Sequence, residues 1–153
     1  MDDRKRTDVG FYHCTRAPAG SVAVQLAAKA HARGLRLLVI GSADRLGALD
    51  RALWVADPLS FLPHAIAGGP HDAHQPILLS QTPEPLNGAR LLMVLASGLP
   101  AGFGGFDRVL NLFDDGSEAH ERARIDWKAL DRRDDVQRSY WRQAGQAGWE
   151  KMG

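Results

Sequence analysis

One short apolar segment constrains the fold of this chain more than any other feature of its sequence. Residues Leu35 to Ile40 form a continuous apolar run that is broken only by Arg36. Such a run is typical of a central strand that is buried on both faces of a parallel sheet. It follows a helical pattern that begins near Ser21, in an N-cap position, and ends at Gly34, a typical C-cap residue.

The elements around this run alternate between strand and helix. Val9 to Cys14 is predicted to be the first strand, and Ser42 or Asp44 is expected to cap a second helix that runs to about Trp54. This order predicts a parallel βαβ unit with a right-handed crossover. Later elements are the strands Pro76–Ser80, Leu91–Leu95 and Val109–Phe113 and a helix from the capping Ser117 to about Arg132.

Together these elements predict a single Rossmann-like α/β domain over residues 1–153, with a mostly parallel sheet flanked by helices. From about residue 134 the chain carries Tyr140, Trp141 and Trp149 among polar and glycine residues. We expect this tail to be less ordered, except where the rings find a surface to pack against.

Composition limits the function classes that remain open. The chain has 153 residues, 44% of them hydrophobic, and a net charge of +1. This charge is too small to give an overall positive potential that would attract nucleic acid. The single cysteine, Cys14, rules out an internal disulfide and a zinc site built from several cysteines. No apolar run approaches the roughly 20 residues that span a bilayer, and no apolar signal core follows the charged N-terminus. We therefore expect a cytoplasmic protein with no membrane partner.

The loops that would hold a phosphate in a Rossmann-like fold lack the necessary residues. The first strand-to-helix turn, residues 15–20, has one glycine and no G-x-G-x-x-G pattern, and no lysine follows the second turn, residues 41–44. Residues 102–105 are rich in glycine but precede a strand, so no helix start would aim amides at an anion. The sequence predicts no functional dinucleotide-binding loop and no cofactor. A nucleotide-binding or hydrolytic Rossmann-like enzyme is the alternative function.

Three histidines lie close together in the sequence. His64, His71 and His74, with Asp72, are residue types that bind zinc. The prolines and glycines around them place them on a loop with no helix to align them, which favours a solvated polar loop. No nucleophile and base stand out together, so we predict no catalytic and no metal-binding residues.

The helix that begins near Ser117 carries two adjacent stripes of different chemistry. Apolar side chains share one stripe at about 100° per residue, and basic side chains at i and i+4 spacing form its neighbour. The stripes comprise Ala119, Ala123, Trp127 and Leu130, and His120, Arg124 and Lys128. An apolar ledge with a cationic rim suits an acidic peptide that ends in a large apolar residue. The alternative is a core-facing amphipathic helix with a solvated basic edge.

Several segments, taken in order, resemble one known family. They are Val9–Tyr12, Leu49–Trp54, Ser60–His64, Arg108–Asp114 and Ala123–Lys128. Over most of its length the chain is similar to the chi subunit of bacterial DNA polymerase III holoenzyme, a clamp-loader accessory protein. The resemblance implies a Rossmann-like domain with no catalysis of its own. It also implies an adaptor that links the clamp loader, through the psi subunit, to the acidic C-terminal tail of single-stranded DNA-binding protein, which ends in proline and phenylalanine.

The resemblance also assigns residues to these two partners. The residues for the tail are Arg124, Lys128, Trp127, Phe113 and Trp54. The two cations would meet its acidic residues or terminal carboxylate, and the three rings would line the apolar part of the site. The residues for a psi-like subunit, or for another replication or repair protein, are Phe61, Leu62, Pro63 and His64.

Two further expectations follow from the resemblance. His120 stands where relatives can carry a fixed cation, so the rim of the tail site would be weaker or pH-sensitive. Contact with DNA would be only indirect, through the partner proteins, and the chain would be a monomer within a hetero-complex.

Overall fold

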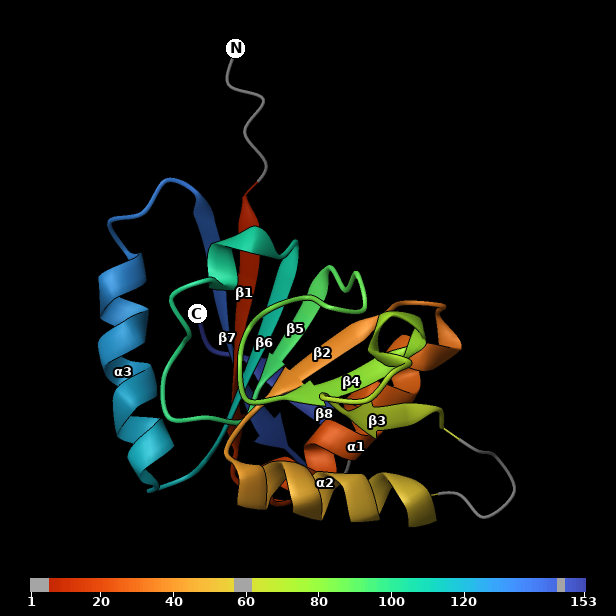
Figure 1. The fold of residues 1–153 in the computed structure, drawn as a ribbon. Helices are drawn as coiled ribbons and strands as arrows, with labels where there is room; N and C mark the ends of the chain where they lie inside the picture. Colours follow the sequence, from red (N-terminus) through yellow and green to blue (C-terminus); the bar gives the residue numbers. More distant parts are fainter. Residues whose placement is uncertain (1–5, 57–61, 146–147) are drawn as a thin grey trace.

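The computed structural model describes residues 6–56, 62–145 and 148–153, and its strands form one open sheet (Figure 1). The order across the sheet is β3-β4-β2-β5-β6-β1-β7-β8, and neighbouring strands are parallel except β7 and β8. The strands are β1 (Thr7–Cys14), β2 (Leu37–Ile40), β3 (His64–Ile66), β4 (Ile77–Ser80), β5 (Leu91–Val94), β6 (Arg108–Asp114), β7 (Val136–Ala144) and β8 (Gly148–Lys151). The helices are α1 (Ala19–Ala32), α2 (Ala43–Val55) and α3 (Glu118–Leu130), with short 3-10 helices at Asp72–His74 and Phe103–Gly105. The mostly parallel α/β architecture confirms the predicted fold class.

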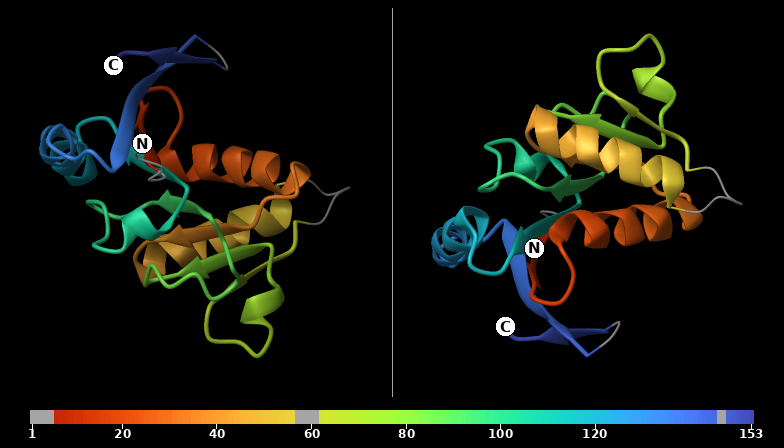
Figure 2. Two further views of the ribbon diagram at one scale, coloured as in Figure 1. Left: turned by 90° about the horizontal axis from the view of Figure 1, so that it is seen from above. Right: turned by 90° about the horizontal axis from the view of Figure 1, so that it is seen from below.

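The sheet separates two apolar layers. One layer lies between the sheet and the helices α1 and α2, and the other lies between the sheet and α3. In β2, Leu37 and Val39 belong to the first layer and Leu38 and Ile40 to the second, and all four are buried. The continuous apolar run predicted this two-sided burial. Figure 2 shows α1 and α2 side by side, with α3 apart from them and next to β7. Among the described helices, none has the length and apolar character needed to cross a bilayer.

Local capping bonds start the helices α2 and α3. Ser42 Oγ accepts a hydrogen bond from the Arg45 amide at 3.3 Å, and Ser117 Oγ accepts one from the His120 amide at 3.1 Å. These bonds confirm Ser117 as the cap of α3 and select Ser42, rather than Asp44, as the cap of α2. The sequence could predict these serine caps because each serine bonds to an amide only three residues further along the chain.

The end of the sheet that contains β7 and β8 was not predicted. β7 pairs in parallel with β1, and its side chains alternate, so that Tyr140 packs against the α3 layer and Trp141 against the α1/α2 layer. The sequence led us to expect order from residue 134 only where the rings pack, but the chain there forms two regular strands. The main partner of β7 is a strand more than a hundred residues away, and most β7 side chains are polar, so no local apolar pattern indicates it.

We predict that the fold depends strongly on β7 and much less on β8. Ending the chain after residue 134 would remove one of the two parallel neighbours of the buried strand β1, and we expect cooperative unfolding to be lost. Ending it after Ala144 would remove β8 and the contact between the Trp149 and Tyr12 rings, whose centroids are 5.2 Å apart. This second chain should be less stable but still folded. Circular dichroism and urea unfolding would compare the two, and equal stability would contradict the prediction.

Candidate functional site

The helix α3 presents one face to the core and a charged face to solvent. Ala123 and Leu130 are buried in the layer beneath the helix, whereas Arg124 and Lys128 are exposed. Trp127 is half-buried at the border between these faces. The apolar stripe therefore faces the core, and Arg124 and Lys128 lie along its solvent edge, whereas His120 of the predicted basic stripe is buried. We call Arg124, Trp127 and Lys128 the α3 surface.

Contacts from β1 and β7 hold the Trp127 ring in place. Its edge-to-face partners are Phe11 and Tyr140, with ring centroids 5.3 and 5.6 Å away. The Arg138 guanidinium lies 4.0 Å from the Trp127 ring centroid, which is a cation–π contact, and its ion pair with Asp131 at 2.8 Å fixes it there. The ring is therefore a fixed platform rather than a mobile side chain.

The other two rings assigned to the same site lie elsewhere. Phe113 on β6 is 1% exposed and stacks on His120, with centroids 5.5 Å apart, so it supports α3 from below without reaching the surface. Trp54 is 56% exposed near the end of α2, on the opposite face of the sheet, where its ring contacts His64. The structure therefore does not bring Trp54 to Arg124. The sequence pattern indicates which face of a helix is apolar but not which side of the sheet the helix covers.

Two histidines and an aspartate meet where β1, the β6–α3 loop and α3 converge. His13 Nε2 lies 2.8 Å from Asp115 Oδ1, and His120 Nδ1 lies 3.7 Å from the same oxygen. Burial, followed by the nearby His13 and Arg124, lowers the pKa of His120. The hydrogen bond from His13 lowers the pKa of Asp115. His120 is therefore uncharged at neutral pH and adds no fixed charge to the α3 surface.

Sequence reasoning did not find His13 or Asp115. The two residues are 102 positions apart, and the parallel pairing of β1 with β6 brings them together. Neither position stands in a motif, so no signal in a single sequence could have identified the pair.

The amides that would hold a phosphate are bonded to side chains of this chain. α1 begins at Ala19 rather than at the predicted cap Ser21, and the Ala19 amide donates to Asp114 Oδ1 at 2.8 Å. Gln143 Oε1 on β7 accepts hydrogen bonds from the amides of residues 16–17 at 2.9 and 3.1 Å. A phosphate would have to displace both acceptors, and the Asp114 charge would repel it. This arrangement argues against the nucleotide-binding alternative.

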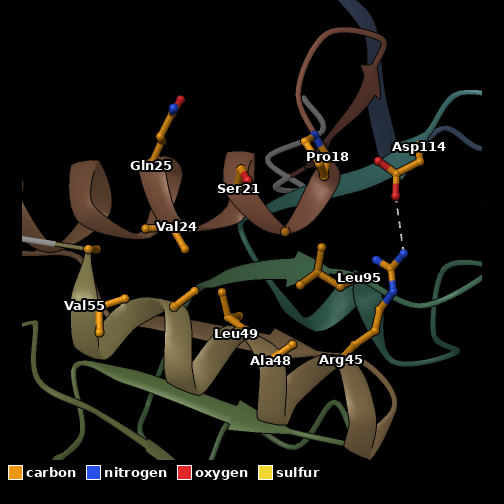
Figure 3. Close-up of a pocket in the computed structure, with 13 residues that line it drawn as sticks. Pro18, Ser21, Val24, Gln25, Arg45, Ala48, Leu49, Val55, Leu95 and Asp114 are labelled. Atoms are coloured by element: carbon orange, nitrogen blue, oxygen red, sulfur yellow. Dashed lines mark hydrogen bonds and ion pairs between the residues drawn. The ribbon is translucent and has the colours of Figure 1, made fainter.

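A pocket of about 560 Å³ lies between α1 and α2 (Figure 3). Its walls are mainly apolar and include Val24 of α1 and Leu49 and Val55 of α2. An ion pair between Arg45 and Asp114, with an N–O distance of 3.4 Å, lies at one end. Because each charge faces the other, the pocket offers apolar contact rather than a charged subsite.

Of the residues assigned to a psi-like partner, the structure describes Leu62, Pro63 and His64. Phe61 falls outside the described residues. Leu62 and His64 are buried, and Pro63 is half-buried. His64 Nδ1 lies 2.6 Å from the Leu62 carbonyl oxygen, and its Nε2 lies 3.1 Å from Asp50 Oδ1. Leu62 and His64 therefore support the segment from within rather than presenting side chains to a partner.

Exposed apolar side chains lie at the end of α2 and on β3, on either side of this segment, and Val55 among them also forms part of the wall of the pocket between α1 and α2. Trp54, Val55 and Ile66 are 56%, 76% and 48% exposed, and they come from the end of α2 and from β3, which contact each other. We call these three residues the α2-end surface. Because β3 is an edge strand of the sheet, its outer side faces away from the other strands.

The loop that carries His71, Asp72 and His74 is polar and exposed to solvent, as the sequence predicted for these residues. His71 and His74 are exposed. Asp72 accepts hydrogen bonds from the amides of Gly68 and Gly69 at 2.9 and 3.2 Å, so its carboxylate closes the loop on itself. His64 is buried against α2, away from solvent.

The fold and its surfaces define a Rossmann-like α/β protein in which the phosphate-binding position is filled by its own side chains. Its exposed surfaces include the basic and aromatic α3 surface and the apolar α2-end surface. The family model for the DNA polymerase III chi subunit, HolC, matches residues 7–138, so the chain belongs to this family of replication accessory proteins. No curated protein sequence matches the chain.

We predict that the thiol of Cys14 is unreactive in the folded protein. Burial, with a further contribution from the Asp114 carboxylate, raises the pKa of this thiol to about 12. A free cysteine has a pKa of about 8.5, so at pH 8 a disulfide reagent should react with folded Cys14 on the order of a thousandfold more slowly. The rate should rise roughly tenfold per pH unit as the thiolate forms. The urea-unfolded chain is the control, and a fast reaction of the folded protein at pH 8 would contradict the prediction.

Proposed function

We propose that this chain is an adaptor of the replication machinery and that its α3 surface binds the acidic C-terminal tail of single-stranded DNA-binding protein. Membership of the chi family supports the accessory role. The observation that carries the proposal is the exposure of Arg124 and Lys128, one turn apart, beside the fixed and half-buried ring of Trp127. The two cations bind carboxylates of the tail, and the ring packs against its terminal phenylalanine.

The size of this surface sets the strength of binding that we expect. A tail of a few residues covers much less area than a standard protein–protein interface, so we expect a dissociation constant in the micromolar range and rapid exchange. Exposed charge pairs are screened within about 8 Å at physiological ionic strength, so added salt should weaken binding further. Weak, salt-sensitive contact is suited to an adaptor that exchanges between many copies of its partner.

We predict that Arg124→Ala weakens binding of a labelled tail peptide by about ten- to a hundredfold, because a hydrogen bond to a charged group contributes about 1.5–3 kcal/mol. Fluorescence anisotropy would measure it. Lys29→Ala, which removes one positive charge from an exposed position of α1 on the opposite face, is the matched control and should bind as the unmodified chain does. Equal binding by the two variants would contradict the assignment.

We further propose that the α2-end surface docks a second partner, a psi-like subunit of the clamp loader. Three exposed apolar side chains beside an edge strand are the kind of patch that a partner covers. Trp54 belongs to this surface rather than to the tail site, and Phe61 follows it closely in the sequence. Because α2 and α3 cover opposite faces of the sheet, the two partners can bind at the same time.

We predict that Val55→Asp abolishes complex formation with the clamp loader and leaves the fold intact, because Val55 is 76% exposed. Leu86→Asp is the matched control, since Leu86 is 48% exposed and lies in the β4–β5 connection. Gel filtration with the purified clamp-loader proteins would measure the complex. Retention of the complex by Val55→Asp would contradict the proposal.

A further inference from the structure

The cluster formed by His13, Asp115 and His120 has the composition and spacing of a metal site. One ligand atom from each side chain lies within 4.8 Å of the others. The two histidine nitrogens lie 2.8 and 3.7 Å from the same carboxylate oxygen. Tetrahedral zinc with bonds of 2.0–2.1 Å needs ligand atoms about 3.3 Å apart, so these separations lie on either side of the required value.

The surrounding hydrogen bonds orient the ligand atoms. His13 Nε2 donates to Asp115 Oδ1, so a bound ion would require the tautomer that carries the proton on Nδ1, which lies 3.2 Å from the Tyr140 hydroxyl and can donate to it. An outer partner of this kind is typical of metal-bound histidine. The Gly116 amide donates to His120 Nδ1 at 3.0 Å, which requires an unprotonated nitrogen there whose lone pair accepts this bond.

Access to the cluster is open on one side. The side chains of His13 and His120 are 11% and 10% exposed, whereas that of Asp115 is 63% exposed. An ion would therefore enter past the carboxylate and bind against two fixed imidazole rings, whose centroids are 4.3 Å apart.

We propose that His13, Asp115 and His120 bind a first-row divalent transition-metal ion, of which zinc is the best-suited probe. Two imidazole nitrogens and a carboxylate oxygen are a donor set that zinc accepts, and three protein ligands leave one position open to solvent. The ion would link β1, the β6–α3 loop and the first turn of α3. This inference rests on the cluster alone and is independent of the function proposed for the α3 surface.

Two features of the site limit its affinity. The positive charges of Arg124 on α3 and Arg142 on β7 act on the cluster and would repel a bound metal cation. Zinc at His120 Nδ1 would also displace the hydrogen bond from the Gly116 amide. We therefore expect a dissociation constant in the micromolar range, weaker than in sites with a full set of protein ligands.

Isothermal titration of the chelator-treated full chain with zinc chloride tests the proposal. We expect one zinc per chain, at least tenfold weaker binding by Asp115→Asn, and no binding by His120→Gln. The exposed Asp115 makes its amide variant a conservative change, and circular dichroism would verify that both variants fold. A double variant with His71→Ala and His74→Ala removes exposed loop histidines and should bind as the unmodified chain does.

A second readout locates the ion. In the amide NMR spectrum, zinc should shift the Gly116 resonance of the unmodified chain, and folded Asp115→Asn should need at least tenfold more zinc for the same fractional shift. The proposal is overturned by the absence of stoichiometric binding, by unchanged binding in folded Asp115→Asn, or by loss of binding in the loop double variant.

Discussion

The parallel pairing of β1 with β6 on one side and with β7 on the other is the constraint on which the rest of this structure depends. It places Phe11 of β1, Phe113 of β6 and Tyr140 of β7 in the same apolar layer, beneath α3. The Tyr140 ring lies 6.4 Å from that of Phe11 and 6.1 Å from that of Phe113. Aromatic pairs of this kind add about 0.5–1.5 kcal/mol each beyond their buried area. These three rings support α3 from below, and two of them, Phe11 and Tyr140, hold the Trp127 ring in its position at the surface.

In the same sheet, the position that holds a phosphate in nucleotide-binding Rossmann-like folds is occupied by side chains of this chain. The carboxyl ends of parallel strands usually gather amides and a helix N-terminus that attract an anion. Here Asp114 supplies that negative charge to the start of α1, and Gln143 satisfies the loop that precedes it. Asp114 also pairs with Arg45 of α2. These polar groups therefore link β6, α1, α2 and β7 to one another.

The sequence predicted those features that depend on neighbouring residues. The buried run of β2, the serine caps of α2 and α3, and the amphipathic character of α3 all follow from side chains within one or two turns of each other. β7 could not be predicted in the same way, because its order comes from pairing with β1 across the length of the chain. The separation of Trp54 from α3 could not be predicted for a related reason, since only the three-dimensional crossover decides which face of the sheet α2 covers. The exposed positions of Arg124 and Lys128 agree with the predicted basic stripe, whereas His120 of the same stripe is buried, because periodicity does not indicate how the first turn of α3 packs against β1 and β6.

We propose that α3, and not the pocket between α1 and α2, receives the acidic tail. Amide chemical shifts of the nitrogen-15-labelled chain, recorded while unlabelled tail peptide is added, test it most directly. We expect the largest shifts at residues 124–128 and at the Trp127 indole, with smaller changes at Tyr140 behind the ring. Shifts confined to Val24, Leu49 and their neighbours in the pocket, with α3 unchanged, would contradict it.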